Sequence, residues 1–194
     1  EDALDRLFPR FRDGDHKNWA VAISRAKTGS DSPLEAVNWT AATEQHPVCK
    51  EVMRIVGSGA EGRTVRKELG ESPYGWPQDA IDGALICLHA TGHLTARYAG
   101  NALVAGQLDQ AKAGKAEFRV ETATLSAQDK IKLRGLFQEA GLSAKTSDDL
   151  TIKSSEFLDV LEKLSERAGG EPPLPERPKT VHLADLRSLA GNER

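Results

Sequence analysis

One run of residues in this chain has the spacing of a phosphate-binding loop. It is Gly57-Ser58-Gly59-Ala60-Glu61-Gly62-Arg63-Thr64, in which Arg63 stands where such loops carry lysine. A nucleotide loop also follows a buried β-strand, whereas the apolar residues before Gly57 recur at helical spacing. We therefore favour the end of one helix and the start of the next over a nucleotide site, and predict no cofactor-binding residue in this chain.

A second group contains the side chains that could ligate zinc: His46, Cys49, Cys87, His89 and His93. Cys87 and His89 are two residues apart on a predicted helix and therefore point in different directions. Cys49 lies in an apolar helical pattern, where a free thiol behaves as a small hydrophobic side chain. We favour core residues over a metal site. Because no Gly-x-Ser-x-Gly elbow or comparable frame exposes a nucleophile, we also predict no catalytic residues and no enzymatic activity in this chain.

Three short helical patterns lie between His46 and Gly92. The first begins at Pro47, where a missing N–H costs nothing, and stops at Gly57. The second has Val65 and Leu69 one turn apart and ends in a Gly- and Pro-rich turn over residues 70–76. The third begins at Pro77 and places one apolar stripe toward a core. That stripe consists of Ile81, Ala84, Leu85 and Leu88.

Two alternating runs follow the helices and predict β-strands. Leu94 to Ala99 is the first, Gly100-Asn101 predicts a tight reversal, and Glu117 to Leu125 is the second, with Phe118, Val120 and Ala123 facing one way. Three helices followed by two strands is the chain order of a winged helix-turn-helix. The predicted fold class is mainly α with a small β wing, built as a winged helix-turn-helix core with flanking helices.

The flanking sequence divides the chain into four predicted parts. Residues 1–45 carry supporting helices that brace the first helix of the module, one of them opened by a capping box at Ser32-Pro33-Leu34-Glu35. Residues 46–125 are the winged helix-turn-helix module. Residues 126–170 form a helical hairpin, whose first helix has Ile131, Leu136 and Ala140 on its apolar side. Residues 171–194 are a proline-rich spacer and the start of a further helix.

The amino-acid composition limits the kinds of partner and the cellular compartment that we expect for this chain. The 194 residues carry 26 Lys and Arg against 29 Asp and Glu, so there is no overall attraction to phosphates or anionic lipid. The two cysteines favour a reducing compartment. The single methionine is Met53, and no apolar run follows position 1. We expect an internal piece of a larger cytoplasmic protein that does not contact a membrane.

The third helix would occupy the recognition position of a helix-turn-helix. Its exposed early residues would be Gln78, Asp79 and Asp82, and two acidic side chains there would repel phosphates. In the preceding turn we expect Trp76 to pack between helices and leave Tyr74 open as a contact residue. We therefore predict that the module docks other proteins through Tyr74, Gln78, Asp79 and Asp82.

Double-stranded DNA remains the alternative partner, held weakly and without strong sequence preference through the wing. The basic residues available for that contact are Arg63, Arg66 and Lys67 on the second helix and Arg97, Lys112 and Lys115 around the wing. The alternative interpretation is that these charges form a solvent-exposed face without a DNA partner, which agrees with the docking prediction.

Several stretches resemble an internal segment of a known family. They are Arg6-Leu7-Phe8-Pro9-Arg10-Phe11, His46-Pro47-Val48-Cys49, the run 73–85 that opens with Pro73-Tyr74-Gly75-Trp76-Pro77, Phe118-Arg119-Val120-Glu121, and Ala190-Gly191-Asn192. The chain resembles part of the large P-loop ATPase, of the BrxC or PglY type, in bacterial BREX phage-defence systems. The resemblance spans nearly the whole chain, and the Tyr-Gly-Trp-Pro run is its most specific part.

The resemblance implies an AAA+-type parent ATPase that binds ATP outside this piece. It also implies partners among the other BREX components, including a methyltransferase and an alkaline-phosphatase-like protein. No catalytic residue carries over, because Arg63 replaces the lysine of a phosphate loop. Winged helices attached to such ATPases can touch DNA, so the resemblance keeps the alternative partner open.

Overall fold

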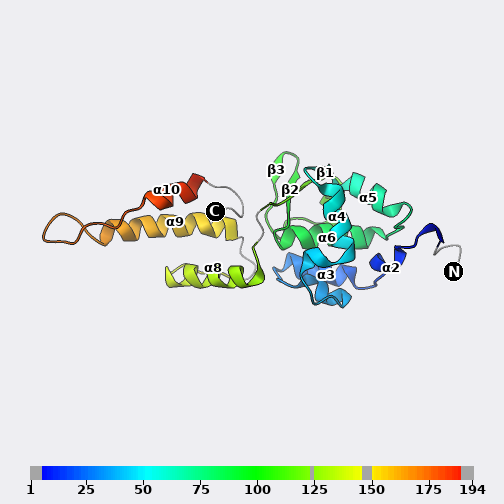
Figure 1. The fold of residues 1–194 in the computed structure, drawn as a ribbon, viewed down its shortest axis with the longest axis horizontal. Coiled ribbons are helices and arrows are strands. Elements are labelled where there is room, and N and C mark those ends of the chain that lie inside the picture. Colours follow the sequence, from blue (N-terminus) through cyan, green and yellow to red (C-terminus); the bar gives the residue numbers. More distant parts are fainter. Residues whose placement is uncertain (1–5, 123–124, 146–149, 189–194) are drawn as a thin grey trace. The chain divides into compact units, whose positions relative to one another are not determined.

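The computed structural model describes residues 6–122, 125–145 and 150–188 (Figure 1). The chain divides into two compact units, the first ending at Thr122 and the second beginning at Ala123. The residues that we predicted as separate N-terminal supports belong to the first unit and share its core. The chain is mainly helical with one small antiparallel sheet, which confirms the predicted fold class at that level.

The first unit is built around α6, which spans Gln78–Ala90. Its ten residues from Ala80 to His89 are all buried, so this helix is covered on every side and not only on the predicted stripe. Helix α3 (Trp19–Lys27) packs along it most extensively. A methyl group at Gly83 would lie 2.6 Å from Cε3 of Trp19, so only glycine allows the two helices to approach this closely.

Two further helices pack against α6, as the sequence predicts. Helix α4 covers Pro47–Val56 and ends at Gly57, whose φ is 46°. Helix α5 covers Gly62–Gly70 and buries Val65 and Leu69, the two residues that were predicted to share a face. Both helices are amphipathic, and burying their apolar sides against α6 accounts for their place in the core.

The sheet has the strand order β1-β4-β2-β3, with antiparallel neighbours. Strand β2 (Leu94–Tyr98) and strand β4 (Glu117–Val120) are the two predicted wing strands. The sequence analysis missed β1 (Ala60–Glu61) and β3 (Asn101–Ala102), since two-residue strands carry no periodicity. The reversal lies at Ala99-Gly100, one residue earlier than predicted, because Tyr98 pairs with Asn101. Leu94, Ala96 and Phe118 face the core, and Ala123 lies outside the described residues.

The connection from β3 to β4 closes over the core. It contains the short helix α7 (Gln110–Ala113), which packs against α6, and it buries Leu108, Ala113 and Ala116. The segment between the two predicted strands is therefore an ordered part of the unit.

The N-terminal elements differ from prediction in two ways. Residues Pro33–Val37 form the 3₁₀ helix η1 and the Ser32 side chain makes no capping hydrogen bond, so the predicted capping box is wrong. Helix α3 packs mainly on α6 and on η1, whereas we expected the N-terminal helices to brace the first helix of the module. Two short elements, α2 (Phe11–Gly14) and the 3₁₀ helix η2 (Thr43–Gln45), were not predicted.

Two of the stretches that carry the family resemblance bind each other. The Trp76 indole N–H donates to the Arg10 carbonyl at 2.7 Å, and the Arg10 N–H donates to the Pro73 carbonyl at 3.2 Å. Gly75, with φ 61°, lies so close to Phe8 that a Cβ would be 2.5 Å from the ring. Trp76 is 3% exposed, which confirms that it packs in the core. We name this contact between residues 73–76 and residues 8–10 the Trp-Gly clamp. It holds two segments of the first unit together.

The described residues of the second unit form the helices α8, α9 and α10. Helices α8 (Ala127–Glu139) and α9 (Leu150–Arg167) form the predicted hairpin, with the Phe137 and Phe157 rings 5.2 Å apart. The predicted face of α8 is wrong, because Ile131 and Leu136 are 65% and 47% exposed while Phe137 is buried. The proline-rich residues 171–180 are non-helical, and α10 (Val181–Ser188) then packs on α9. None of the helices in the described ranges is long and apolar enough to cross a membrane.

His46 joins the N-terminal elements to α4. Its Nδ1 accepts a hydrogen bond from the Val48 N–H at 3.2 Å and so caps the helix, and its ring lies edge-on to Trp19 and Trp39. Burial lowers the pKa of His46 to about 4, an effect that Asp13 partly offsets and His16 slightly reinforces. The folded protein therefore favours the neutral ring, which keeps Nδ1 free to accept.

This depressed pKa predicts a loss of stability in mild acid. As pH falls from 6.5, the ordinary value, toward about 4, the unfolded chain gains a proton at His46 that the folded chain does not. The loss should reach roughly 3 kcal/mol and stop growing below the folded pKa. His46→Asn keeps a capping acceptor without titrating, so urea unfolding between pH 7 and 4 should show a flatter profile for the variant. Identical pH profiles for both proteins would contradict this role.

Candidate interaction surface

The loop-like run from Gly57 to Thr64 does not have the architecture of a nucleotide site. Helix α4 precedes it, its centre pairs with β4 as β1, and α5 follows. The Gly62 N–H donates to the Ala116 carbonyl at 3.0 Å and the Arg63 N–H donates to the Gly114 carbonyl at 2.9 Å. These are amides that a phosphate loop would turn toward its anion. They hold the β3–β4 connection instead, in agreement with the interpretation as a helix end and a helix start.

The potential zinc ligands each have a structural environment. Cys49 and Cys87 are fully buried in the apolar core, and burial raises the pKa of the Cys49 thiol and raises that of Cys87 to about 12. Nδ1 of His89 lies 3.0 Å from the Leu94 carbonyl oxygen. Nε2 of His93 lies 3.1 Å from Glu44. In the described ranges no three such side chains gather as metal ligands.

A buried ion pair joins α5, α6 and the β3–β4 connection. The Arg66 guanidinium donates to both carboxylate oxygens of Asp82, at 2.7 and 2.9 Å, and to the Gln110 carbonyl at 2.9 Å. Asp82 is completely buried and also accepts from Gln78 at 3.2 Å. We name this set the Arg66–Asp82 lock. Bidentate geometry of this kind fixes orientation as well as adding attraction.

The Arg66–Asp82 lock shows that the predicted roles of two site residues are wrong. Asp82 was expected among the exposed contacts of the third helix, and Arg66 among possible DNA contacts. Asp82 lies instead beneath the surface, because α6 is covered where a free recognition helix would be open. Arg66 turns inward to neutralise it. Neither side chain presents its charge to a partner.

Gln78 and Asp79 remain at the surface, as predicted. They occupy the first turn of α6, where the macrodipole favours the Asp79 carboxylate. Asp79 accepts a hydrogen bond from the Gln110 side chain at 2.9 Å. The exposed part of α6 is therefore limited to one polar, acidic turn.

Tyr74 is half-buried within a charged network. Its hydroxyl donates to Glu51 at 3.0 Å and accepts from Arg54 at 3.2 Å. The Arg10 guanidinium lies 5.2 Å from the ring centroid and forms an ion pair with Glu51. Tyr74 thus ties α4 to the Trp-Gly clamp, and only part of the side chain faces solvent.

Glu51 is the centre of this network, and the sequence analysis did not identify it. Burial alone would raise the pKa of its carboxyl group. Hydrogen bonds from Arg54, Arg10 and Tyr74 outweigh that effect and hold the pKa at about 2. Nothing local marks Glu51 or Arg10, because they lie 41 residues apart in the chain and meet only in the folded unit.

The remaining basic residues that were predicted as possible DNA contacts differ in their surroundings. Lys112 is engaged locally, 3.3 Å from Asp109 and donating to the Gln107 carbonyl at 2.7 Å. Arg97 lies opposite Glu117 in the β2–β4 register, and Arg63 pairs with Glu61. Lys67 and Lys115 are exposed. Acidic side chains therefore alternate with these cations instead of leaving a continuous positive stripe. Arg119 on β4 is a further exposed cation that the predictions did not include.

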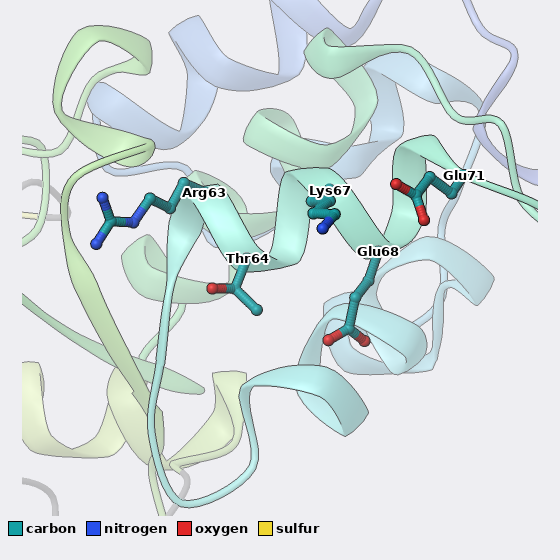
Figure 2. A pocket seen from close by; sticks show the side chains of 5 residues that line it. All are labelled: Arg63, Thr64, Lys67, Glu68 and Glu71. Carbon is teal, nitrogen blue, oxygen red and sulfur yellow. The ribbon is translucent and has the colours of Figure 1, made fainter.

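Beside the outer face of α5 is an open hollow of about 700 Å³. Figure 2 shows its lining side chains, all carried by α5 and the residue after it. They are Arg63, Thr64, Lys67, Glu68 and Glu71. Four of the five lining residues are charged, with both signs represented, which suits a charged polypeptide better than an apolar ligand.

Comparison with protein-family models, curated proteins and solved structures found no match to this chain. The assignment of function therefore depends on the geometry above and on the sequence resemblance.

The lock makes a strong prediction about stability. Asp82→Ala should cost about 3–5 kcal/mol, because it leaves the Arg66 charge partly buried without its partner. Asp79→Ala is the matched control: it removes a carboxylate from the same helix at an exposed position and should cost about 1 kcal/mol or less, from the loss of its interaction with the helix dipole. Urea denaturation followed by tryptophan fluorescence measures both. Equal, small losses for the two variants would contradict the structural role of the lock.

Proposed function

We propose that this chain is a non-catalytic docking module of winged-helix topology that binds partner proteins within a BREX-type ATPase. The topology is supported by the element order α4, β1, α5, α6, β2, β4, in which the strand between the first two helices pairs with the last strand. The BREX assignment is supported by the sequence resemblance. In this proposal ATP binds elsewhere in the parent protein.

The burial of α6 is the observation that favours a protein over duplex DNA as the partner. A helix-turn-helix reads duplex DNA by inserting its third helix into the major groove. Here α3, α7 and the sheet cover α6, and its one exposed turn presents Gln78 and the acidic Asp79. A helix in that position cannot enter a groove without uncovering the core. Docking through the outer surface of the unit requires no such rearrangement.

The contacts within the Trp-Gly clamp change the set of residues that we propose for binding a partner. Tyr74 and Trp76 belong to the most specific stretch of the resemblance, and both bind other parts of the chain. Their shared role is to hold the N-terminal segment against α4 and the turn before α6. We keep Gln78 and Asp79 as contact residues and place Tyr74 at the half-exposed edge of the network.

Co-purification of the parent ATPase with the other BREX components tests this proposal. Gln78→Lys combined with Asp79→Lys should lower the recovered partners several-fold, because the change reverses the charge of the exposed turn. Both positions are exposed, and circular dichroism checks that the variant stays folded without the Gln78–Asp82 and Gln110–Asp79 hydrogen bonds. Removing residues 1–122 from the parent should abolish the association. Full recovery of every component without residues 1–122 would refute the proposal.

Double-stranded DNA stays as a second candidate, motivated by the exposed cations on and beside the sheet. Arg97 and Arg119 lie on its solvent side, and Lys115 lies two residues before the start of β4. Their neighbours Glu61 and Glu117 weaken the local positive potential.

The DNA candidate predicts duplex binding that weakens steeply with salt, because released counterions drive it. Fluorescence anisotropy of the 194-residue chain with a labelled duplex measures this. Arg97→Glu with Lys115→Glu should reduce the affinity at least about tenfold at low salt, whereas Lys112→Glu should have less effect, since Lys112 is already engaged by Asp109. No binding at low salt would remove this candidate.

A further inference from the structure

The outer face of α5 is a ridge with an ordered charge pattern. Arg63 and Lys67 are four residues apart, Thr64 and Glu68 form the adjoining row, and Glu71 directly follows the end of the helix. Rows spaced by four residues are the ridges through which helices pack against each other. The close view in Figure 2 shows these side chains standing away from the helix backbone.

The opposite side of α5 is fixed. Val65 and Leu69 are fully buried, and Arg66 belongs to the lock with Asp82. The backbone of Gly62 and Arg63 is hydrogen-bonded to the β3–β4 connection. A partner would therefore meet a preorganised surface and lose little conformational entropy in the scaffold.

Most of the charges on this ridge have no ion-pair partner among the described residues. Lys67, Glu68 and Glu71 form no ion pair in the part of the chain that the structure describes. Arg63 pairs with Glu61 but its side chain is still 75% exposed. Like charges four residues apart on a helix, such as Arg63 and Lys67, repel each other. An acidic partner opposite them would turn that repulsion into attraction.

We propose that this ridge docks an α-helix of a partner protein with the complementary charge order. That helix carries two acidic residues one turn apart, facing Arg63 and Lys67, followed by basic residues facing Glu68 and Glu71. This inference rests on the proposed docking function and names its surface and the chemistry of its partner. Complementary charges at an interface select the partner and its orientation and speed association, while the hollow beside the ridge leaves room for the incoming side chains.

Photocrosslinking in the assembled parent complex tests this surface. The photoreactive residue p-benzoylphenylalanine replaces Thr64, which lies between the basic and acidic ends, and in a control it replaces Ala20, an exposed residue of α3. The expected product joins position 64 to a helix of another BREX component that has the acidic pair and the basic residue. Crosslinks from position 64 to a second copy of this chain, to DNA, or to nothing would overturn the inference.

Charge reversal supplies the second measurement. Arg63→Glu with Lys67→Glu should reduce co-purification at least about tenfold, and reversing the acidic pair of the crosslinked helix should restore it. Lys17→Glu with Lys50→Glu is the matched control, because it makes the same change in net charge at exposed positions elsewhere in the unit.

The outcomes separate this inference from the proposed function. If removal of residues 1–122 abolishes association but reversal at Arg63 and Lys67 does not, docking stands and the α5 surface is wrong. If removal leaves the association intact, the proposed function fails and takes this inference with it.

Discussion

The architecture of the first unit follows from the burial of α6 on all sides beyond its exposed first turn. Ten consecutive residues of this helix are buried, and no single neighbouring element could cover them. Helices α3, α4 and α5, the sheet and the β3–β4 connection each take one side. The absence of a side chain at Gly83 lets Trp19 complete the contact with α3. The N-terminal residues are for this reason part of the core and not accessory supports.

The polar side chains on this apolar framework fix its parts relative to each other. Asp82 brings a charge into the core, and Arg66 balances it while also binding the β3–β4 connection. The Trp-Gly clamp acts in the same way at the other end, where Arg10, Glu51 and Tyr74 join three segments that are far apart in sequence. Several residues that the sequence suggested as contacts for a partner, such as Asp82, Arg66 and Tyr74, thus bind other parts of the chain and stabilise the fold. What remains for a partner is the outer face of α5, the first turn of α6 and the solvent side of the sheet.

These remaining surfaces carry charges of both signs. Mixed charge is poorly suited to a phosphate backbone, which rewards a continuous positive surface, and well suited to another protein that must be selected among many. The buried position of α6 leads to the same choice by an independent argument, because groove insertion needs an exposed helix. The burial of α6 and the mixed surface charge therefore both support the proposed docking role.

Local sequence patterns were enough to predict the helices α4, α5 and α6, the strands β2 and β4 and the packing of Trp76, because these depend on periodicity, on proline and glycine at helix ends, and on one large side chain that must be buried. They could not predict that Asp82 is buried, since an acidic residue near a helix start favours solvent unless an arginine from another helix meets it. They also missed the two-residue strands and the face of α8, where Phe137 is buried and Ile131 is exposed. The contacts between side chains far apart in the chain emerged only from the folded protein, because burial and pairing of charges depend on neighbours that local patterns do not specify.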